Sequence, residues 1–200
     1  MDNICKPEET DNRVTANFWF SELIRSNTAD KYGIDNYPSD SVKKNLEDSC
    51  KYLWQPARDV LNKPMHPSCA HRCKLVNKLV GGSDSSAHVH GFAMDFTAPS
   101  FGRPKDIVKK LVIEFRKKGI KWDQMILEYP DSKTGGWVHL AWKNGQGKQR
   151  CQTLLKTNKI NYKKEICKNI SFFIEKNFIF LLLCPCIPSI FQKHSLYRFR

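Results

Sequence analysis

The chain has 200 residues, and its 40% content of hydrophobic residues is enough to build one folded domain with a further segment attached. Its formal net charge of +13 at pH 7 can attract nucleic acid, anionic lipid or an anionic cell wall, so charge alone does not choose the partner. Because the sequence contains no helix-turn-helix, zinc-finger or RNA-binding signature, we expect no nucleic-acid partner.

Residues 1–16 are mainly polar, and we expect them to form a loose lead-in to the domain. They contain no apolar signal core, so we expect synthesis in the cytoplasm and reduced thiols rather than a disulfide framework built from the eight cysteines. Cys69 and Cys73 have a spacing that half of a structural zinc site can use. No second Cys/His pair follows at zinc-finger spacing, so we do not expect such a site.

Two helices are predicted in the first third of the chain. The run from Phe18 to Ile24 starts a short helix, with Ser21 as a candidate N-cap. Residues 39–61 form a helix with one buried face, because apolar residues recur there in steps of three and four. Pro56 falls inside this run, so we expect a kink or break near Gln55.

A third helix and a hairpin are predicted after residue 100. Pro104 opens an amphipathic helix, which stops at Gly119 after three cationic residues that suit the helix dipole. Two strands, 124–129 and 137–142, then flank a turn-rich loop. If Glu128 lies opposite Trp137 in this hairpin, Ile126 lies opposite His139. Glu128 and His139 then share one face of the sheet as diagonal neighbours.

Three residues suggest a metal centre. His88 and Asp95, with six residues between them, follow a glycine-containing loop, and His139 lies in the second strand of the predicted hairpin. Two imidazoles and one carboxylate are a usual ligand set for a catalytic zinc, which keeps its fourth position open for water. The set therefore predicts a zinc hydrolase, although the same ligands can hold other divalent ions.

Residues 158–200 differ in composition from the rest. They hold 8 of the 33 Lys and Arg but 2 of the 20 Asp and Glu. The run 178–191 is nearly all apolar, yet it contains two prolines and is shorter than the roughly 20 residues of a spanning helix. Two interpretations stay open: a segment that contacts a membrane surface, and a tail without a selected role. We place the folded domain at residues 17–157.

From about Asn17 to Leu155 the chain resembles the zinc D-Ala-D-Ala carboxypeptidase family, peptidase family M15, and especially its compact branch in bacteriophages and bacteria. The resemblance is an ordered succession of short motifs rather than one long match. These are Asn17-Phe18 through Ser21-Glu22-Leu23, Gly33-Ile34-Asp35-Asn36, Leu53-Trp54-Gln55-Pro56-Ala57-Arg58, Val80-Gly81-Gly82-Ser83, Ser86-x-His88-x-x-Gly91-x-Ala93-x-Asp95, Asp123-Gln124 and Trp137-Val138-His139.

This resemblance implies a small α+β domain, with helices packed on an antiparallel sheet as in the signalling domain of hedgehog proteins. It also implies cleavage of peptide bonds in bacterial peptidoglycan, either at the terminal D-Ala or within the stem peptide. His88, Asp95 and His139 fall on the family's zinc positions. Arg72 falls on an arginine of the substrate site, and Ser86 on a serine beside the substrate.

The chain departs from the family at three places near these residues. Ser68-Cys69-Ala70-His71 stands where relatives usually have a Ser-Gly-aromatic turn, and Ala87 replaces a common Gln. Many relatives carry the catalytic Glu three residues before the last histidine, but that position is Gly136 here. We therefore assign the general base to Glu128, whose carboxylate can take a proton from water and pass it to the leaving amine.

The sequence thus favours an endolysin-like zinc peptidase that acts as a monomer on peptidoglycan stem peptides. Its origin would be phage or bacterial, and it would reach the wall after release from the cell. A zinc-containing module of the same fold that binds the wall without cutting it is the alternative, supported by Gly136. A basic nucleic-acid binder is a third interpretation, and it would show salt-sensitive DNA binding that survives zinc removal.

Overall fold

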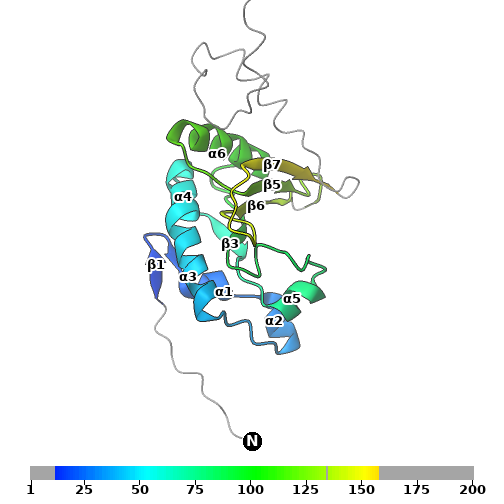
Figure 1. Ribbon diagram of the computed structural model, residues 1–200. Helices are drawn as coiled ribbons and strands as arrows, with labels where there is room; N and C mark the ends of the chain where they lie inside the picture. The colour runs from blue at the N-terminus through cyan, green and yellow to red at the C-terminus, as the bar shows by residue number, and fades with distance from the viewer. Residues whose placement is uncertain (1–11, 134, 158–200) are drawn as a thin grey trace, which may run out of the picture.

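The computed structural model describes residues 12–133 and 135–157, which form an α+β domain (Figure 1). Its centre is a five-stranded sheet in the order β3-β4-β6-β5-β7. The strands are β3 (His66–Cys69), β4 (Ala93–Thr97), β5 (Gln124–Glu128), β6 (Trp137–Ala141) and β7 (Gln152–Lys156). All neighbouring pairs are antiparallel except β5 and β7, which run parallel. The predicted α+β fold class is confirmed. The sheet was expected to be antiparallel, and β7 adds one parallel pair to it.

The predicted hairpin has the predicted register. Glu128 is the partner of Trp137, and Ile126 is the partner of His139. Because side chains alternate between the two faces of a strand, Glu128 and His139 point to the same face of the sheet. We call it the site face, because it also carries Asp95, the partner of His139 on β4.

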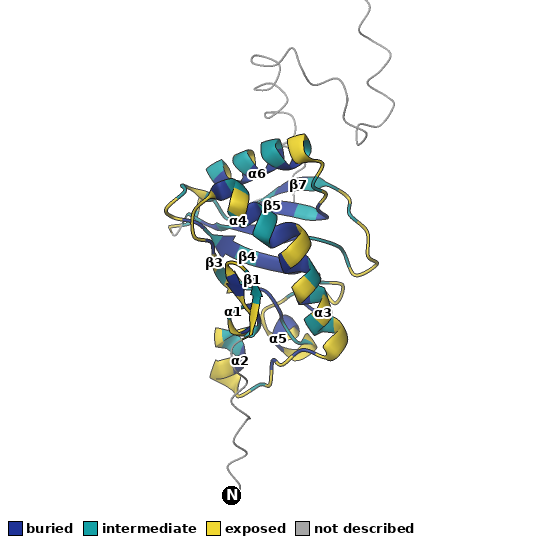
Figure 2. Cartoon of the chain, turned by 90° about the vertical axis from the view of Figure 1, so that its left-hand side faces the viewer, coloured by how far each residue is buried: buried dark blue, intermediate teal, exposed yellow. Residues whose placement is uncertain are grey.

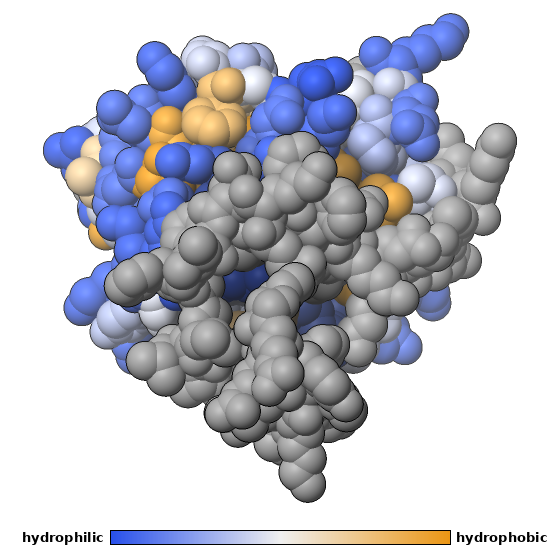
Figure 3. Space-filling view, turned by 90° about the horizontal axis from the view of Figure 1, so that it is seen from above, coloured by the Kyte–Doolittle hydropathy of each residue, from blue (hydrophilic) through white to orange (hydrophobic). Residues whose placement is uncertain are grey.

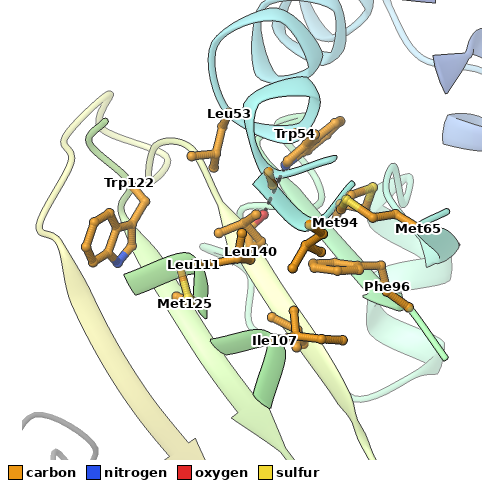
Figure 4. Packing of buried hydrophobic residues seen from close by; sticks show 14 of the residues in the cluster. Leu53, Trp54, Met65, Met94, Phe96, Ile107, Leu111, Trp122, Met125 and Leu140 are labelled. Carbon is orange, nitrogen blue, oxygen red and sulfur yellow. Dashed lines mark hydrogen bonds between the residues drawn. The ribbon is translucent and has the colours of Figure 1, made fainter. Parts of the chain in front are cut away.

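The opposite face of the sheet packs against helices and forms the core (Figures 2 and 4). The main covering helix is α6 (Pro104–Lys118), which ends before Gly119 at a φ of +67°, as predicted. Its apolar side belongs to one core cluster with the core-facing residues of β4, β5 and β6. The fully buried members of this contact are Met94, Phe96, Ile107, Leu111, Phe115, Met125 and Leu140.

The second element that covers this face is one continuous helical run, whose helix type changes along its length. It consists of α3 (Asp40–Ser49), the π-helix η1 (Cys50–Trp54) and α4 (Gln55–Leu61). The expected irregularity near Gln55 is therefore the end of the π-helix. Pro56 lies in the first turn of α4, a place where its missing N–H is tolerated. The indole of Trp54 anchors the run to the sheet by donating to the Leu140 carbonyl at 3.2 Å.

The N-terminal elements differ from the prediction in two details. Residues 13–15, expected in the loose lead-in, form β1 (Arg13–Thr15), which pairs with β2 (Phe18–Trp19). Helix α1 (Phe20–Ile24) begins one residue before Ser21, so Ser21 is not its N-cap. The cap position is Trp19, whose backbone N–H donates to the Glu22 carboxylate at 2.9 Å. A carboxylate three residues after the cap can satisfy the first turn in this way.

Two short helices, α2 (Asn27–Tyr32) and α5 (Lys74–Leu79), complete the described part. Viewed from above, its surface is mainly hydrophilic with smaller hydrophobic patches (Figure 3). Among the residues described, no helix combines the length and apolar character that crossing a membrane requires. The predicted tail, residues 158–200, lies outside the described residues.

Candidate metal centre

The structure brings His88, Asp95 and His139 together on the site face. Asp95 and His139 are register partners on neighbouring strands, so their side chains stand next to each other. His88 arrives from the loop before β4, where tight turns bond the Val89 N–H to the Ser86 carbonyl and the Phe92 N–H to the Ala87 carbonyl. Three residues from two strands and a loop thus converge at one point.

The three donor atoms form a small triangle. His88 Nε2 lies 3.2 Å from His139 Nδ1 and 3.3 Å from Asp95 Oδ1, and His139 Nδ1 lies 2.8 Å from the same oxygen. Ligand atoms held at about 2.0–2.1 Å by one tetrahedral zinc are separated by about 3.3 Å. The spacing of the donors therefore fits a metal ion of this kind.

The hydrogen bonding of His88 shows which of its two ring nitrogens carries the hydrogen. Its Nδ1 lies 2.7 Å from the Ala70 carbonyl, which can only accept, so Nδ1 carries the hydrogen and Nε2 presents a lone pair. That lone pair faces the Asp95 carboxylate inside a buried site, where two acceptors repel each other. A cation between them converts the repulsion into attraction. A backbone carbonyl that orients the ring is also a usual partner of a metal-binding histidine.

The charge states in the site suit metal binding. Burial lowers the pKa of His88, which favours the neutral imidazole. For Asp95, burial alone would raise the pKa, but the charges and hydrogen bonds that His88 and His139 supply when protonated hold it well below its usual range. A neutral imidazole and an ionised carboxylate are the forms that ligate a metal.

Cys69 also belongs to the cluster, which the sequence did not indicate. It is the register partner of Asp95 on β3, and its Sγ lies 3.9 Å from His88 Nδ1. Donor atoms of Cys69, His88 and Asp95 all lie within 4.8 Å of one another. Burial, with a smaller effect of the Asp95 charge, raises the pKa of the Cys69 thiol to about 12. The pairing of β3 with β4 joins distant segments, so no local pattern could reveal this position.

Arg72 and Ser86 are the two residues predicted at the substrate site, and each has its own surroundings in the structure. The Arg72 backbone N–H donates to the His88 carbonyl at 3.3 Å, and its charge acts on both His88 and Cys69. Its Nε is buried and has no hydrogen-bond partner in the described part of the chain. The Arg72 guanidinium is therefore a cation beside the triangle, and its Nε–H is available to donate a hydrogen bond. Ser86 is half-buried, and its backbone opens the turn that carries His88.

Glu128 lies on the site face, two residues along β5 from the partner of His139. Its side chain is 10% exposed and pairs with Lys156 on β7, with Nζ 3.3 Å from Oε2. The carboxylate is thus held on the site face by a lysine from the neighbouring strand.

Gly136, where many relatives have the catalytic Glu, cannot hold a side chain in this hairpin. Its φ is +72°, and a Cβ added there would clash with the backbone carbonyl oxygen of Glu128. The loop conformation itself therefore requires glycine at this position. Glu128, on the first strand of the hairpin, is an acidic residue that lies on the site face.

One comparison with known proteins gave a match. A family model described as Peptidase M15 matches residues 16–121, which is just over half of the chain. The matched region includes Arg72, His88 and Asp95 and ends before Glu128 and His139. No curated protein matches the chain.

Proposed function

The chain belongs to the peptidase M15 family, and from this premise we propose that it is a zinc-dependent peptidase of bacterial peptidoglycan stem peptides. It would release terminal D-Ala or cut within the stem peptide, as an endolysin does. The observation that carries the proposal is the triangle of His88 Nε2, Asp95 Oδ1 and His139 Nδ1, with separations of 2.8–3.3 Å.

These three residues would hold the metal, with His88 oriented by the Ala70 carbonyl. Bound zinc supplies Lewis acidity, which polarises a carbonyl and lowers the pKa of a water to near 7. The ligands are two neutral imidazoles and one carboxylate, so the centre keeps a net positive charge that favours an anionic transition state.

The remaining roles fall to side chains around the triangle. Glu128 would accept the proton of the attacking water and return it to the leaving amine. Lys156 keeps that carboxylate oriented through the 3.3 Å ion pair. The planar guanidinium of Arg72 would bind the terminal carboxylate of the substrate or the developing oxyanion. Ser86, at the turn that carries His88, would contact the substrate backbone.

The proposed setting follows from the substrate. Peptidoglycan lies outside the cytoplasm, so a protein made in the cytoplasm of a phage-infected or bacterial cell would act after release. The net charge of +13 favours contact with an anionic wall and shortens the search for substrate. We expect the enzyme to act as a monomer without a nucleic-acid partner.

A synthetic peptide that ends in D-Ala-D-Ala tests the activity. Zinc-loaded protein should release D-Ala, a chelator should stop the release, and added zinc should restore it. A well-folded, zinc-loaded protein that cleaves neither this peptide nor an internal stem-peptide bond would contradict the proposal.

One observation favours a second candidate, a wall-binding module of the same fold that does not cut. The loop before His139 has Gly136 in place of the usual acid, and its conformation excludes a side chain. In that case the protein would sediment with purified cell walls in a zinc-dependent manner while the walls release no fragments.

A further inference from the structure

Four potential metal donors, rather than three, surround one carboxylate on the site face. Cys69, Asp95 and His139 are register partners on the adjacent strands β3, β4 and β6, so they form a row across the sheet. His88 approaches the row from the preceding loop, with Nε2 3.3 Å from Asp95 Oδ1. A zinc hydrolase needs three protein ligands, so the thiol is surplus to the proposed reaction.

The thiol is close enough to join the metal. Donor atoms of Cys69, His88 and Asp95 lie within 4.8 Å of one another. In a tetrahedral site with zinc–sulfur bonds of about 2.3 Å, sulfur lies about 3.6 Å from the other ligand atoms. The donors of this group must therefore approach by up to about 1.2 Å, and the Cys69 Sγ, which lies 3.9 Å from His88 Nδ1, must turn toward the Nε2 side of that ring.

We propose that Cys69 is a fourth protein ligand, which closes the metal centre in the resting protein. The inference rests on the proposed function for the metal and for the other three ligands. On coordination the thiol releases its proton to solvent and binds as thiolate. Substrate or water must then displace the sulfur before hydrolysis, so the closed centre is a resting form and the open centre is the working form. Four protein ligands are the pattern of closed, structural zinc sites.

The other described cysteines do not share this position. Cys73 caps α5, where its Sγ accepts from the Val76 N–H at 3.5 Å. Cys50 is fully buried in the core between the helices and the sheet, and Cys151 packs against that core. Cys73 is thus a matched control, because it is four residues from Cys69 and equally half-buried, yet engaged elsewhere.

Cobalt reports a thiolate ligand directly. Full-length protein loaded with Co²⁺ in place of zinc is compared with Cys69→Ser and Cys73→Ser variants by absorption spectroscopy. We expect a near-ultraviolet thiolate-to-cobalt charge-transfer band in the wild type and in Cys73→Ser, and its loss in Cys69→Ser. Zinc affinity, measured by competition with a chromophoric chelator, should fall at least about tenfold in Cys69→Ser, since even indirect partners of a metal contribute that much.

Two further measurements make the result decisive. Circular dichroism checks that Cys69→Ser is folded, and Cys69→Ala replaces it if it is not. Metal analysis of Cys69→Ser at saturating cobalt should still give about one Co²⁺ per chain, because the other three proposed ligands remain. A wild-type protein that binds one Co²⁺ without the charge-transfer band overturns the inference and leaves the peptidase proposal intact. A band that persists in Cys69→Ser overturns it as well. Failure of every variant to bind metal would overturn both.

Discussion

Glu128→Gln should separate catalysis from stability. The amide keeps the shape of the side chain and removes its charge, and Glu128 lies outside the proposed ligand set. Zinc should therefore stay bound. Loss of the partly buried ion pair with Lys156, whose Nζ is 3.3 Å from Oε2, should cost about 1 kcal/mol or less in the free energy of unfolding. Loss of a general base lowers the rate about 10²–10⁴-fold, or about 3–5 kcal/mol in activation free energy.

Lys156→Met is the matched control, because it removes the same ion pair from the other side. If the pair is only structural, both variants should lose similar stability and similar activity. If Glu128 is the base, Glu128→Gln should be far less active than Lys156→Met at similar stability. Metal analysis, thermal unfolding and D-Ala release measure the three quantities. A rate loss below about tenfold in Glu128→Gln would refute the assignment of the base.

Three other predictions follow from the structure. His139→Ala should lose most zinc by metal analysis, and full occupancy would remove it from the ligand set. Truncation after Thr157 keeps β7 and should leave a folded, active protein; an insoluble or inactive fragment would show that the tail belongs to the fold. Gly136→Ala should lower the unfolding temperature more than Gly135→Ala, because both have positive φ but a Cβ at 135 meets nothing within 4 Å; equal shifts would contradict this.

Local chemistry made the hairpin and α6 predictable. The loop between the two strands is rich in Gly, Pro and Asp, and alternation along each strand then set which residues face the site. The register that follows, with Ile126 opposite His139, is the one observed. The end of α6 at Gly119 was predictable for a similar reason, since glycine tolerates the positive φ found there.

Contacts between distant segments were not predictable in this way. Cys69 joins the cluster only because β3 pairs with β4, and nothing near Cys69 in the sequence specifies that partner. The ion pair of Glu128 likewise depends on the parallel pairing of β5 with β7. At Gly136 the sequence revealed the missing acid, but the backbone conformation was needed to show that no side chain fits.

The central claim is metal-dependent hydrolysis by the centre of His88, Asp95 and His139. Its most direct test is mass spectrometry of purified peptidoglycan after digestion by the full-length protein, with and without a chelator, beside the His88→Ala variant. The account predicts that the wild-type protein produces stem peptides shortened at one type of bond. These fragments should be absent in the presence of the chelator and in the digest by His88→Ala. Adding zinc back to the chelated wild-type protein should restore them. Unchanged peptidoglycan with zinc-loaded wild type, or the same fragments from His88→Ala, would contradict it.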